Sequence, residues 1–135
     1  MKTASFTILL ALLALPTAAS AADGTTSLIG TWVNSKSSVI VQTEPCGPAL
    51  CGKVVWANAH AQEDARQGGV TQLVGTQVLS GFKRVHAGEW KGTIFVPERG
   101  RTFSSRIFQL SRDQIRVQGC ILAGLVCDGE DWVRR

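Results

Sequence analysis

The sequence predicts a small all-β fold, and we expect the sheet to close as an antiparallel up-and-down β-barrel of about eight strands. Short runs of β-branched and aromatic residues recur at regular spacing, and residues typical of turns separate them. Helical periodicity is almost absent. These features are typical of a sandwich or a barrel. Closure is favoured because it removes the exposed edges that so small a chain would otherwise have to protect.

The N-terminal residues 1–22 are expected to be a signal peptide that is cleaved, so that residues 23–135 form one domain. Lys2 provides a positive start, an apolar run covers residues 6–15, and small residues at 19–21 fit the positions that a signal peptidase reads. The apolar run is about half of the roughly 20 residues that cross a bilayer, so no stable membrane anchor is expected. The protein is therefore expected in the periplasm or outside the cell.

In the first half of the domain, strands are predicted over residues 28–33, 39–43 and 53–57. The last two flank a turn that is rich in cysteine, proline and glycine. Alternation within the third run places Val54 and Trp56 on one face.

A polar segment at residues 58–72 follows, with a helical turn expected over 59–66. Further strands are predicted over 74–84, 90–96, 102–110, 115–121 and 131–135. Their short connections favour antiparallel neighbours. The residues expected to share an inward face are Trp90, Gly92, Ile94, Val96, Phe103, Ser105, Ile107, Ile115, Val117 and Gly119.

Four cysteines follow the expected cleavage region, and an exported domain meets an oxidising compartment. Their Cys-x4-Cys and Cys-x6-Cys spacings suit neither a zinc site nor a thioredoxin-like redox pair. We predict local disulfides, Cys46–Cys51 and Cys120–Cys127, because each pair brackets an expected turn. Closing such a short loop stabilises the fold by roughly 2 kcal/mol. The two long-range pairings would require both turns to meet in space.

No catalytic arrangement stands out, so we expect no enzyme activity, no metal and no cofactor. His60, Glu63 and Asp64 are close in sequence, but polar loop residues facing water are far commoner than a metal or acid–base site with no ligand spacing. A formal charge of +4 argues poorly for nucleic acid in an exported protein. Arg99, Arg101, Arg106, Arg112 and Arg116 cluster in the second half, where a solvated face is favoured over binding of anionic headgroups, cell-wall polymer or an acidic partner.

The two ends of the domain carry a resemblance to a known superfamily. Gly30-Thr31-Trp32 on the first strand resembles the Gly-x-Trp signature of lipocalins and fatty-acid-binding proteins. Trp132-Val133-Arg134 on the last strand supplies the basic residue that packs over this tryptophan in the superfamily. The resemblance implies that Arg134 lies on Trp32 and joins the first strand to the last. Such a cation–π contact is worth about 1 kcal/mol.

A closer resemblance covers nearly the whole domain. The sequence is similar to a family of small exported bacterial proteins named as domain of unknown function 2147, which implies a lipocalin-like barrel with no settled activity. Residues 58–72 depart from the family pattern, so a function of that loop would not carry over. The matching stretches are "GTWV" at 30–33, "PCGPALCGKVVW" at 45–56, "LVGTQVLSGF" at 73–82, "WKGTIFVPERGRTFSSRI" at 90–107 and "VQGCILAGLVCDGEDWVR" at 117–134.

Five apolar residues are the candidates for the interior of the barrel: Trp56, Phe82, Trp90, Ile94 and Phe103. They can form a packed core or line a ligand pocket. The first functional hypothesis is a non-catalytic binding protein for a small apolar or amphipathic ligand. The alternative is an envelope protein–protein interaction module, or a protease-inhibitor-like protein, that acts through its loops.

Overall fold

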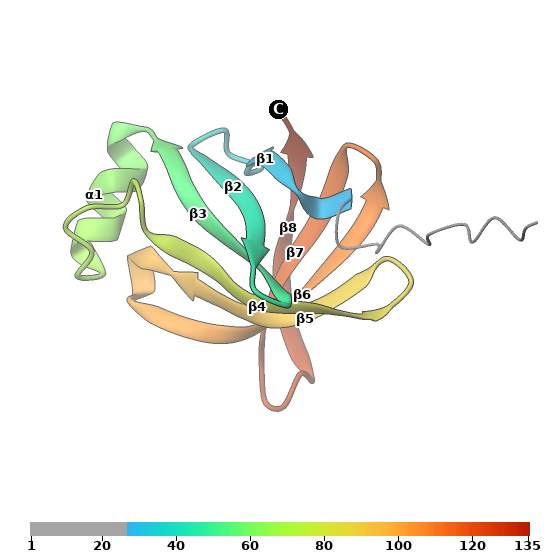
Figure 1. Cartoon of the computed structure of the whole chain (residues 1–135). Coiled ribbons are helices and arrows are strands. Elements are labelled where there is room, and N and C mark those ends of the chain that lie inside the picture. Colours follow the sequence, from blue (N-terminus) through green and yellow to red (C-terminus); the bar gives the residue numbers. More distant parts are fainter. Residues whose placement is uncertain (1–26) are drawn as a thin grey trace, which may run out of the picture.

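A computed structural model describes residues 27–135, so the predicted signal peptide lies outside the described residues. Eight antiparallel strands close into a barrel in sequence order, which confirms the predicted fold class (Figure 1). The elements are β1 (Gly30–Val33), β2 (Val39–Cys46), β3 (Ala49–Ala57), α1 (Ala59–Gln67), β4 (Gln77–His86), β5 (Glu89–Val96), η2 (Pro97–Arg99), β6 (Arg101–Ser111), β7 (Gln114–Ile121) and β8 (Val126–Arg134).

The connections between strands gather at the two ends of the barrel because neighbouring strands run in opposite directions. One end carries the β1–β2, β3–β4, β5–β6 and β7–β8 connections, and we call it the mouth end. The other carries the segment that enters β1, the C-terminus and the remaining turns, and we call it the terminal end. The helix α1 and the short helix η2 both belong to the mouth end.

The middle of the barrel is filled by side chains. Large residues from several strands are fully buried there: Trp32, Trp90, Phe82, Leu50, Leu79, Ile107, Ile115 and Val54. Small inward residues let this packing happen. A Cβ atom on Gly92 would lie only 2.7 Å from Cγ of Phe82, so the ring occupies the space that the glycine leaves. The predicted small residues on the inner faces therefore accommodate bulky neighbours in this part of the barrel.

Barrel closure rests on a short seam between β1 and β8, where only Trp32↔Arg134 and Val33↔Val133 are in register. The guanidinium carbon of Arg134 lies 4.3 Å from the centre of the Trp32 ring, as the resemblance implies. The same group also donates to the carbonyl oxygens of Ile29 (2.9 Å), Ser27 (2.7 Å) and Arg112 (3.1 Å). Arg134 thus joins the chain entry, the last strand and the β6–β7 turn.

Gly30 explains the glycine of the Gly-x-Trp motif in physical terms. Its φ of +148° is one that residues with side chains rarely adopt, and a Cβ atom there would lie 2.5 Å from Nη1 of Arg134. The buried indole of Trp32 donates to the carbonyl oxygen of Leu28 (3.0 Å) and to Oγ1 of Thr43 (3.3 Å). The motif therefore serves to close the terminal end.

Both predicted disulfides are present, Cys46–Cys51 and Cys120–Cys127. The helical turn expected in the polar segment is a nine-residue helix, α1. Asn58 caps its first turn by accepting a hydrogen bond from the backbone N–H of Ala61 (2.8 Å). Strand β8 begins five residues earlier than its predicted start at residue 131, because the second disulfide closes a paired hairpin and not an isolated turn.

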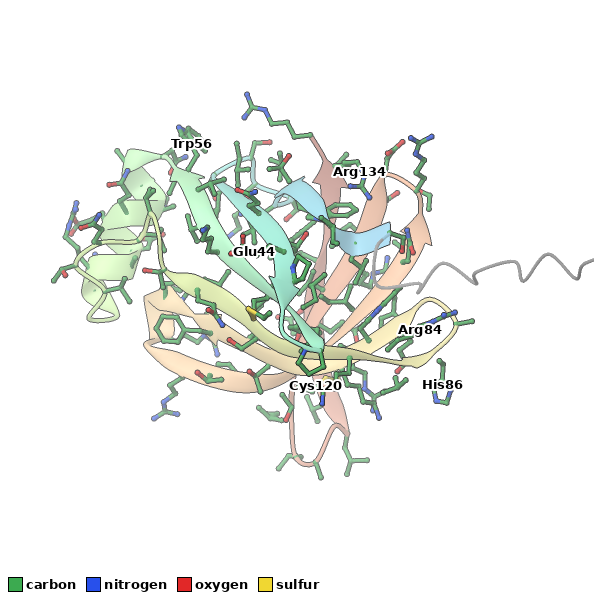
Figure 2. All side chains as sticks on the ribbon, in the orientation of Figure 1. Glu44, Trp56, Arg84, His86, Cys120 and Arg134 are labelled. Carbon is green, nitrogen blue, oxygen red and sulfur yellow. A yellow bond between two sulfur atoms is a disulfide. The ribbon has the colours of Figure 1, made fainter. Side chains whose placement is uncertain are left out.

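The placement of Trp56 in the barrel interior is wrong. The register between β2 and β3 shifts, so that Val41 faces Val54 while the preceding Ile40 faces Trp56. The extra residue, Val55, reverses the alternation along β3. Trp56 therefore lies on the outside of the wall (Figure 2). It is 46% exposed and is paired with Ile40.

Candidate functional site

A solvent-open hollow at the mouth end is the best candidate for a site. It has a volume of about 540 Å³ and is lined by Arg99, Arg101, Phe103 and Ile121. Phe103 and Arg101 alternate with Ser105, which is 2% exposed, and so point to the inner side of β6. The hollow therefore lies over the mouth-end edge of the packed interior.

The two arginines of the hollow are not neutralised by the described residues. Within residues 27–135, neither Arg99 nor Arg101 forms an ion pair or a side-chain hydrogen bond, although both are exposed. Acidic residues on neighbouring segments are Glu98 on η2 and Asp128 on β8, and neither lines the hollow. Two guanidinium groups beside two apolar side chains suit a molecule with an anionic head and an apolar tail.

Close backbone packing holds the arginine-bearing segment in place. A Cβ atom on Gly68, the residue that ends α1, would lie 1.9 Å from the carbonyl oxygen of Pro97. Gly100 has a φ of +59°, and a Cβ atom on it would lie 2.4 Å from the carbonyl oxygen of Gly68. Helix α1 is therefore seated directly on η2, and this contact fixes the turn from which Arg99 and Arg101 project.

The apolar floor of the hollow continues into the barrel through a small residue on β7. A Cβ atom on Gly119 would lie 3.5 Å from Cγ2 of Ile94 and 3.8 Å from Cβ of Phe103, so these three residues meet on the inner face. Ile94 and Phe103 are both half-buried. The predicted interior residues Ile94 and Phe103 are thus together at the mouth end.

The remaining interior candidates lie elsewhere. Phe82 and Trp90 are buried in the core, with 0% and 1% of their surfaces exposed. Nε1 of Trp90 has no hydrogen-bond partner among the described residues, although a buried N–H is usually paired. Trp56 faces outward, as described above. The predicted set is therefore divided between the core, the mouth end and the outer wall.

A second hollow at the terminal end is a weaker candidate. It measures about 710 Å³ and is lined by Ser27, Ile29, Gln109, Ser111, Arg112 and Arg134. The half-buried arginine of this hollow, Arg134, already donates to three backbone carbonyls, and its Nε lies 3.5 Å from the carboxylate of Asp113. Ser27 and Gln109 hydrogen-bond to each other. Among the arginines of this hollow, only the Arg112 guanidinium has no partner in residues 27–135, whereas the mouth-end hollow has two such arginines.

The cluster considered on the polar segment lies on the solvent side of α1. His60 Nε2 is 3.3 Å from Oδ2 of Asp64, while Glu63 pairs with Arg66 at 2.7 Å. Among residues 27–135, no three His, Cys, Asp or Glu side chains are placed to share a metal ion. No helix in the same range is both long and apolar enough to cross a bilayer.

Arg106 and Arg116 lie on the neighbouring strands β6 and β7 but are not directly opposite each other. Arg106 is in register with Gln118, and Arg116 is in register with Phe108 and Asp131. Arg116 makes a two-point contact with Asp131, at 2.8 and 3.2 Å. This hydrogen bonding, aided by the charge of Arg116 and a bond from Gln114, lowers the pKa of Asp131 below its ordinary value.

Sequence reasoning did not single out Arg99 and Arg101, which it grouped with the other arginines of the second half as a solvated face. Arg101 alternates with Phe103, Ser105 and Ile107 along β6, so all four side chains are on the inner face. This alternation is the sequence pattern from which the position of Arg101 could have been predicted. Ile121 lies beside Phe103 because β6 and β7 pair as antiparallel neighbours in a register that places Ser104 opposite Cys120. The two strands and their antiparallel order were predicted from the sequence, but this register was not.

Comparisons with known proteins agree with this architecture. A solved structure with a similar fold is protein HP1028 from the human pathogen Helicobacter pylori, which belongs to the lipocalin family. The TM-score is 0.63 at 15% sequence identity, and the match covers 80% of this chain and 82% of that one. A search of curated proteins finds no match. Residues 30–134 match the model of a family described as uncharacterized protein conserved in bacteria (DUF2147). The chain, whose strands from Gly30 to Arg134 make up this closed barrel, therefore belongs to the DUF2147 family.

Proposed function

We propose that the protein is a non-catalytic binding protein for a small amphipathic anion, with an apolar tail and an acidic head, at the mouth-end hollow. The observation that carries this proposal is the pair of unneutralised arginines, Arg99 and Arg101, beside Phe103 and Ile121 in a hollow of about 540 Å³. This volume is within the range of small-ligand sites. The lipocalin-like fold is consistent with ligand binding, but the residues of the hollow supply the argument for this ligand class.

The filled interior sets how deep the tail can reach. Phe82 fills the space over Gly92, and Leu79 lies 3.0 Å from the position of a Cβ atom on Gly52. The tail would therefore lie along Phe103 and Ile94 near the mouth, while the head group meets the two guanidinium groups. An enzymatic role is not proposed, because no nucleophile or acid–base pair lines this hollow.

Calorimetric titration with dodecanoate below its micelle concentration tests the proposal. We expect saturable binding of dodecanoate, no detectable binding of butyrate, which lacks the tail, and no detectable binding of dodecyltrimethylammonium, which has the opposite charge. Arg101→Gln should weaken dodecanoate binding about tenfold, because a charge-assisted hydrogen bond is lost. Arg84→Gln is the matched control, since Arg84 is exposed at the far end of the β4–β5 hairpin (Figure 2).

Two results would overturn this function. One is equal affinity for the anionic and cationic amphiphiles, which would remove any role for the arginines. The other is an Arg101→Gln variant that remains folded by circular dichroism and binds dodecanoate as tightly as the Arg84→Gln control. Phe103→Ser is a second variant that removes the apolar wall and keeps both charges.

We also propose that the chain is exported to the periplasm or beyond the cell, with residues 1–22 removed. The two disulfides fit a protein that folds in an oxidising compartment. Intact-mass analysis of the protein from its own cells should give a chain that begins at residue 22 or 23 and has four hydrogen atoms fewer than the reduced chain, two for each disulfide. A full-length, reduced chain would contradict export.

The alternative function is a protein–protein interaction module. The feature that favours it is an apolar row of side chains on the outer wall of the barrel, and not the surface of α1. Trp56, Ile40, Val33 and Val133 form one cross-strand row over β3, β2, β1 and β8. Trp56 and Val133, its two ends, are 46% and 53% exposed. If this row binds a partner, Trp56→Ser should abolish co-purification of that partner and leave dodecanoate binding unchanged.

A further inference from the structure

The tip of the β7–β8 hairpin is the most exposed apolar feature in the described part of the chain. Leu125 is 85% exposed and Leu122 is 67% exposed, while Ile121 and Val126 at the base of the tip are each 50% exposed. Figure 1 shows this hairpin extending beyond the other strands at its side of the barrel. The four side chains therefore form a small apolar projection, which we call the hairpin tip.

Neither packing nor turn geometry accounts for leucine at these positions. Leu122 has a φ of +53° and the next residue, Ala123, has a φ of +54°, in a region that glycine and asparagine normally occupy. Leu125 packs against little of the protein, since most of its surface is exposed. The disulfide between Cys120 and Cys127 closes the hairpin immediately behind the tip. The chain thus holds large apolar side chains away from its core.

Arginine side chains surround the hairpin tip on the protein side. Nη2 of Arg106 is 3.4 Å from the position of a Cβ atom on Gly124, within the tip itself. Arg99 and Arg101 share the mouth-end hollow with Ile121. Glu89 lies 4.0 Å from Arg106, Glu98 precedes Arg99 and Asp128 follows the tip on β8. Lys91 is in register with Arg106, so these groups are four cations and three anions. Apolar side chains projecting past a rim of arginines match an interface of acyl chains beneath anionic headgroups.

A protein partner fits these observations less well. Specific protein interfaces use about 20–30 residues on each side, whereas the hairpin tip offers four apolar side chains on one narrow loop. A lipid surface needs no shape complementarity and accepts a narrow projection. We propose that the hairpin tip inserts into the surface of an anionic membrane, with Arg106 at the level of the phosphate groups. The mouth-end hollow then faces the same membrane.

Co-sedimentation of the disulfide-bonded protein with phospholipid vesicles tests this proposal. The protein should bind phosphatidylcholine vesicles that contain phosphatidylglycerol, and bind pure phosphatidylcholine vesicles more weakly. The double variant Leu122→Ser/Leu125→Ser should lower the partition coefficient at least about tenfold, because two leucines no longer enter the interface. Leu110→Ser is the matched control, since this leucine is 45% exposed near the β6–β7 turn at the terminal end.

Charge is tested separately from apolar insertion. Arg106→Gln should reduce binding to the anionic vesicles about threefold to tenfold and flatten its salt dependence, whereas Arg135→Gln at the C-terminus should have little effect. Thermal unfolding of each variant checks that the fold is kept. The proposal is overturned if the native protein does not bind anionic vesicles, or if the double variant and Leu110→Ser bind them equally well.

This proposal and the ligand proposal can fail independently. Leu122 and Leu125 do not line the mouth-end hollow, so the double variant should bind soluble dodecanoate normally. The effect of Arg101→Gln on the affinity for soluble dodecanoate is measured by calorimetry in the absence of any membrane. Retained dodecanoate binding with no vesicle binding would therefore refute the membrane proposal alone.

Discussion

Every nitrogen of the Arg134 guanidinium donates a hydrogen bond to a backbone carbonyl, and the group also covers the Trp32 ring. This concentration of contacts matters because the β1–β8 seam has only two residue pairs in register. Lysine would restore the charge but not the planar fork of donors. At the scale of single residues, we expect Arg134 and the glycine beneath it, Gly30, to contribute most to barrel closure, beside the hydrogen bonds that Thr31 exchanges with Arg135.

Replacement of Arg134 tests that dependence. Arg134→Met should lower the free energy of unfolding by about 3 kcal/mol, and Arg134→Lys should recover less than half of the loss. Arg135→Met, one residue further along and exposed, should change it by less than about 0.5 kcal/mol. Urea denaturation followed by tryptophan fluorescence gives all three values. A loss for Arg134→Met no larger than for the Arg135 control would show that the seam holds without this side chain.

A second residue-scale prediction concerns acid stability. The pKa of Asp131 is lowered in the folded protein by hydrogen bonding to Arg116, so ionised Asp131 favours the folded state above its ordinary pKa of 3.8. That contribution is lost as the pH falls through the lowered folded-state value. Asp131→Asn should therefore have a lower Tm than the native protein near neutral pH, and the gap should shrink in acid.

Thermal melts of Asp131→Asn across the acid range provide the measurement, with Asp128→Asn as the control. Asp128 is exposed on the same strand and forms no ion pair among the described residues. The control should differ little from the native protein at any pH. A Tm gap for Asp131→Asn that stays constant into strong acid would contradict the assigned role of this ion pair.

At the scale of elements, the C-terminal end of α1 packs against η2 and holds it in place, whereas the exposed surface of the helix makes no such contact. Ala65 is the buried residue of the helix, and Gly68 brings the chain into contact with η2 at Pro97. This contact holds the β5–β6 turn at the mouth end. The polar segment at residues 58–72 is thus linked to the candidate site through backbone packing.

Gly68→Ala should separate α1 from η2, because the added Cβ atom would approach the Pro97 carbonyl oxygen to 1.9 Å. We expect a loss of about 1–3 kcal/mol in stability and weaker dodecanoate binding. Gln67→Ala, the exposed preceding residue, is the control and should change neither quantity appreciably. Unchanged calorimetric affinity in a folded Gly68→Ala variant would show that η2 keeps its place without the helix.

The elements also show how far the sequence predicted the fold. Strands β5 and β6 pair without a register shift, so simple alternation placed Trp90, Ile94 and Phe103 on the inner side correctly. Alternation failed at Trp56 because the bulge at Val55 depends on tertiary pairing and has no local signature. The local disulfides were predictable because each closes a short hairpin whose turn residues are visible in the sequence.

At the scale of the whole molecule, barrel closure brings separate segments to one end. Arg99 and Arg101 flank the β5–β6 turn, while Ile121 comes from the β7–β8 hairpin. Their proximity follows from the antiparallel pairing of β6 and β7, in which Ser104 faces Cys120. The sequence predicted these two strands and their antiparallel order, but it did not predict the register that sets Ile121 beside Phe103. The same end carries the hairpin tip, and the opposite end is occupied by the Arg134 seam. The terminal end therefore holds the barrel closed. The mouth end carries two arginines without an ion-pair partner in residues 27–135 and the exposed apolar side chains of the hairpin tip.

The most direct test of ligand binding at the mouth end is two-dimensional NMR of backbone amides during titration with dodecanoate. We expect the largest chemical-shift changes over residues 99–103 and 119–121, with amides near Trp32 and Arg134 unaffected. Changes concentrated at Ser27, Ile29 and Arg112 around the terminal-end hollow, or an absence of changes at saturating dodecanoate, would contradict the proposed site.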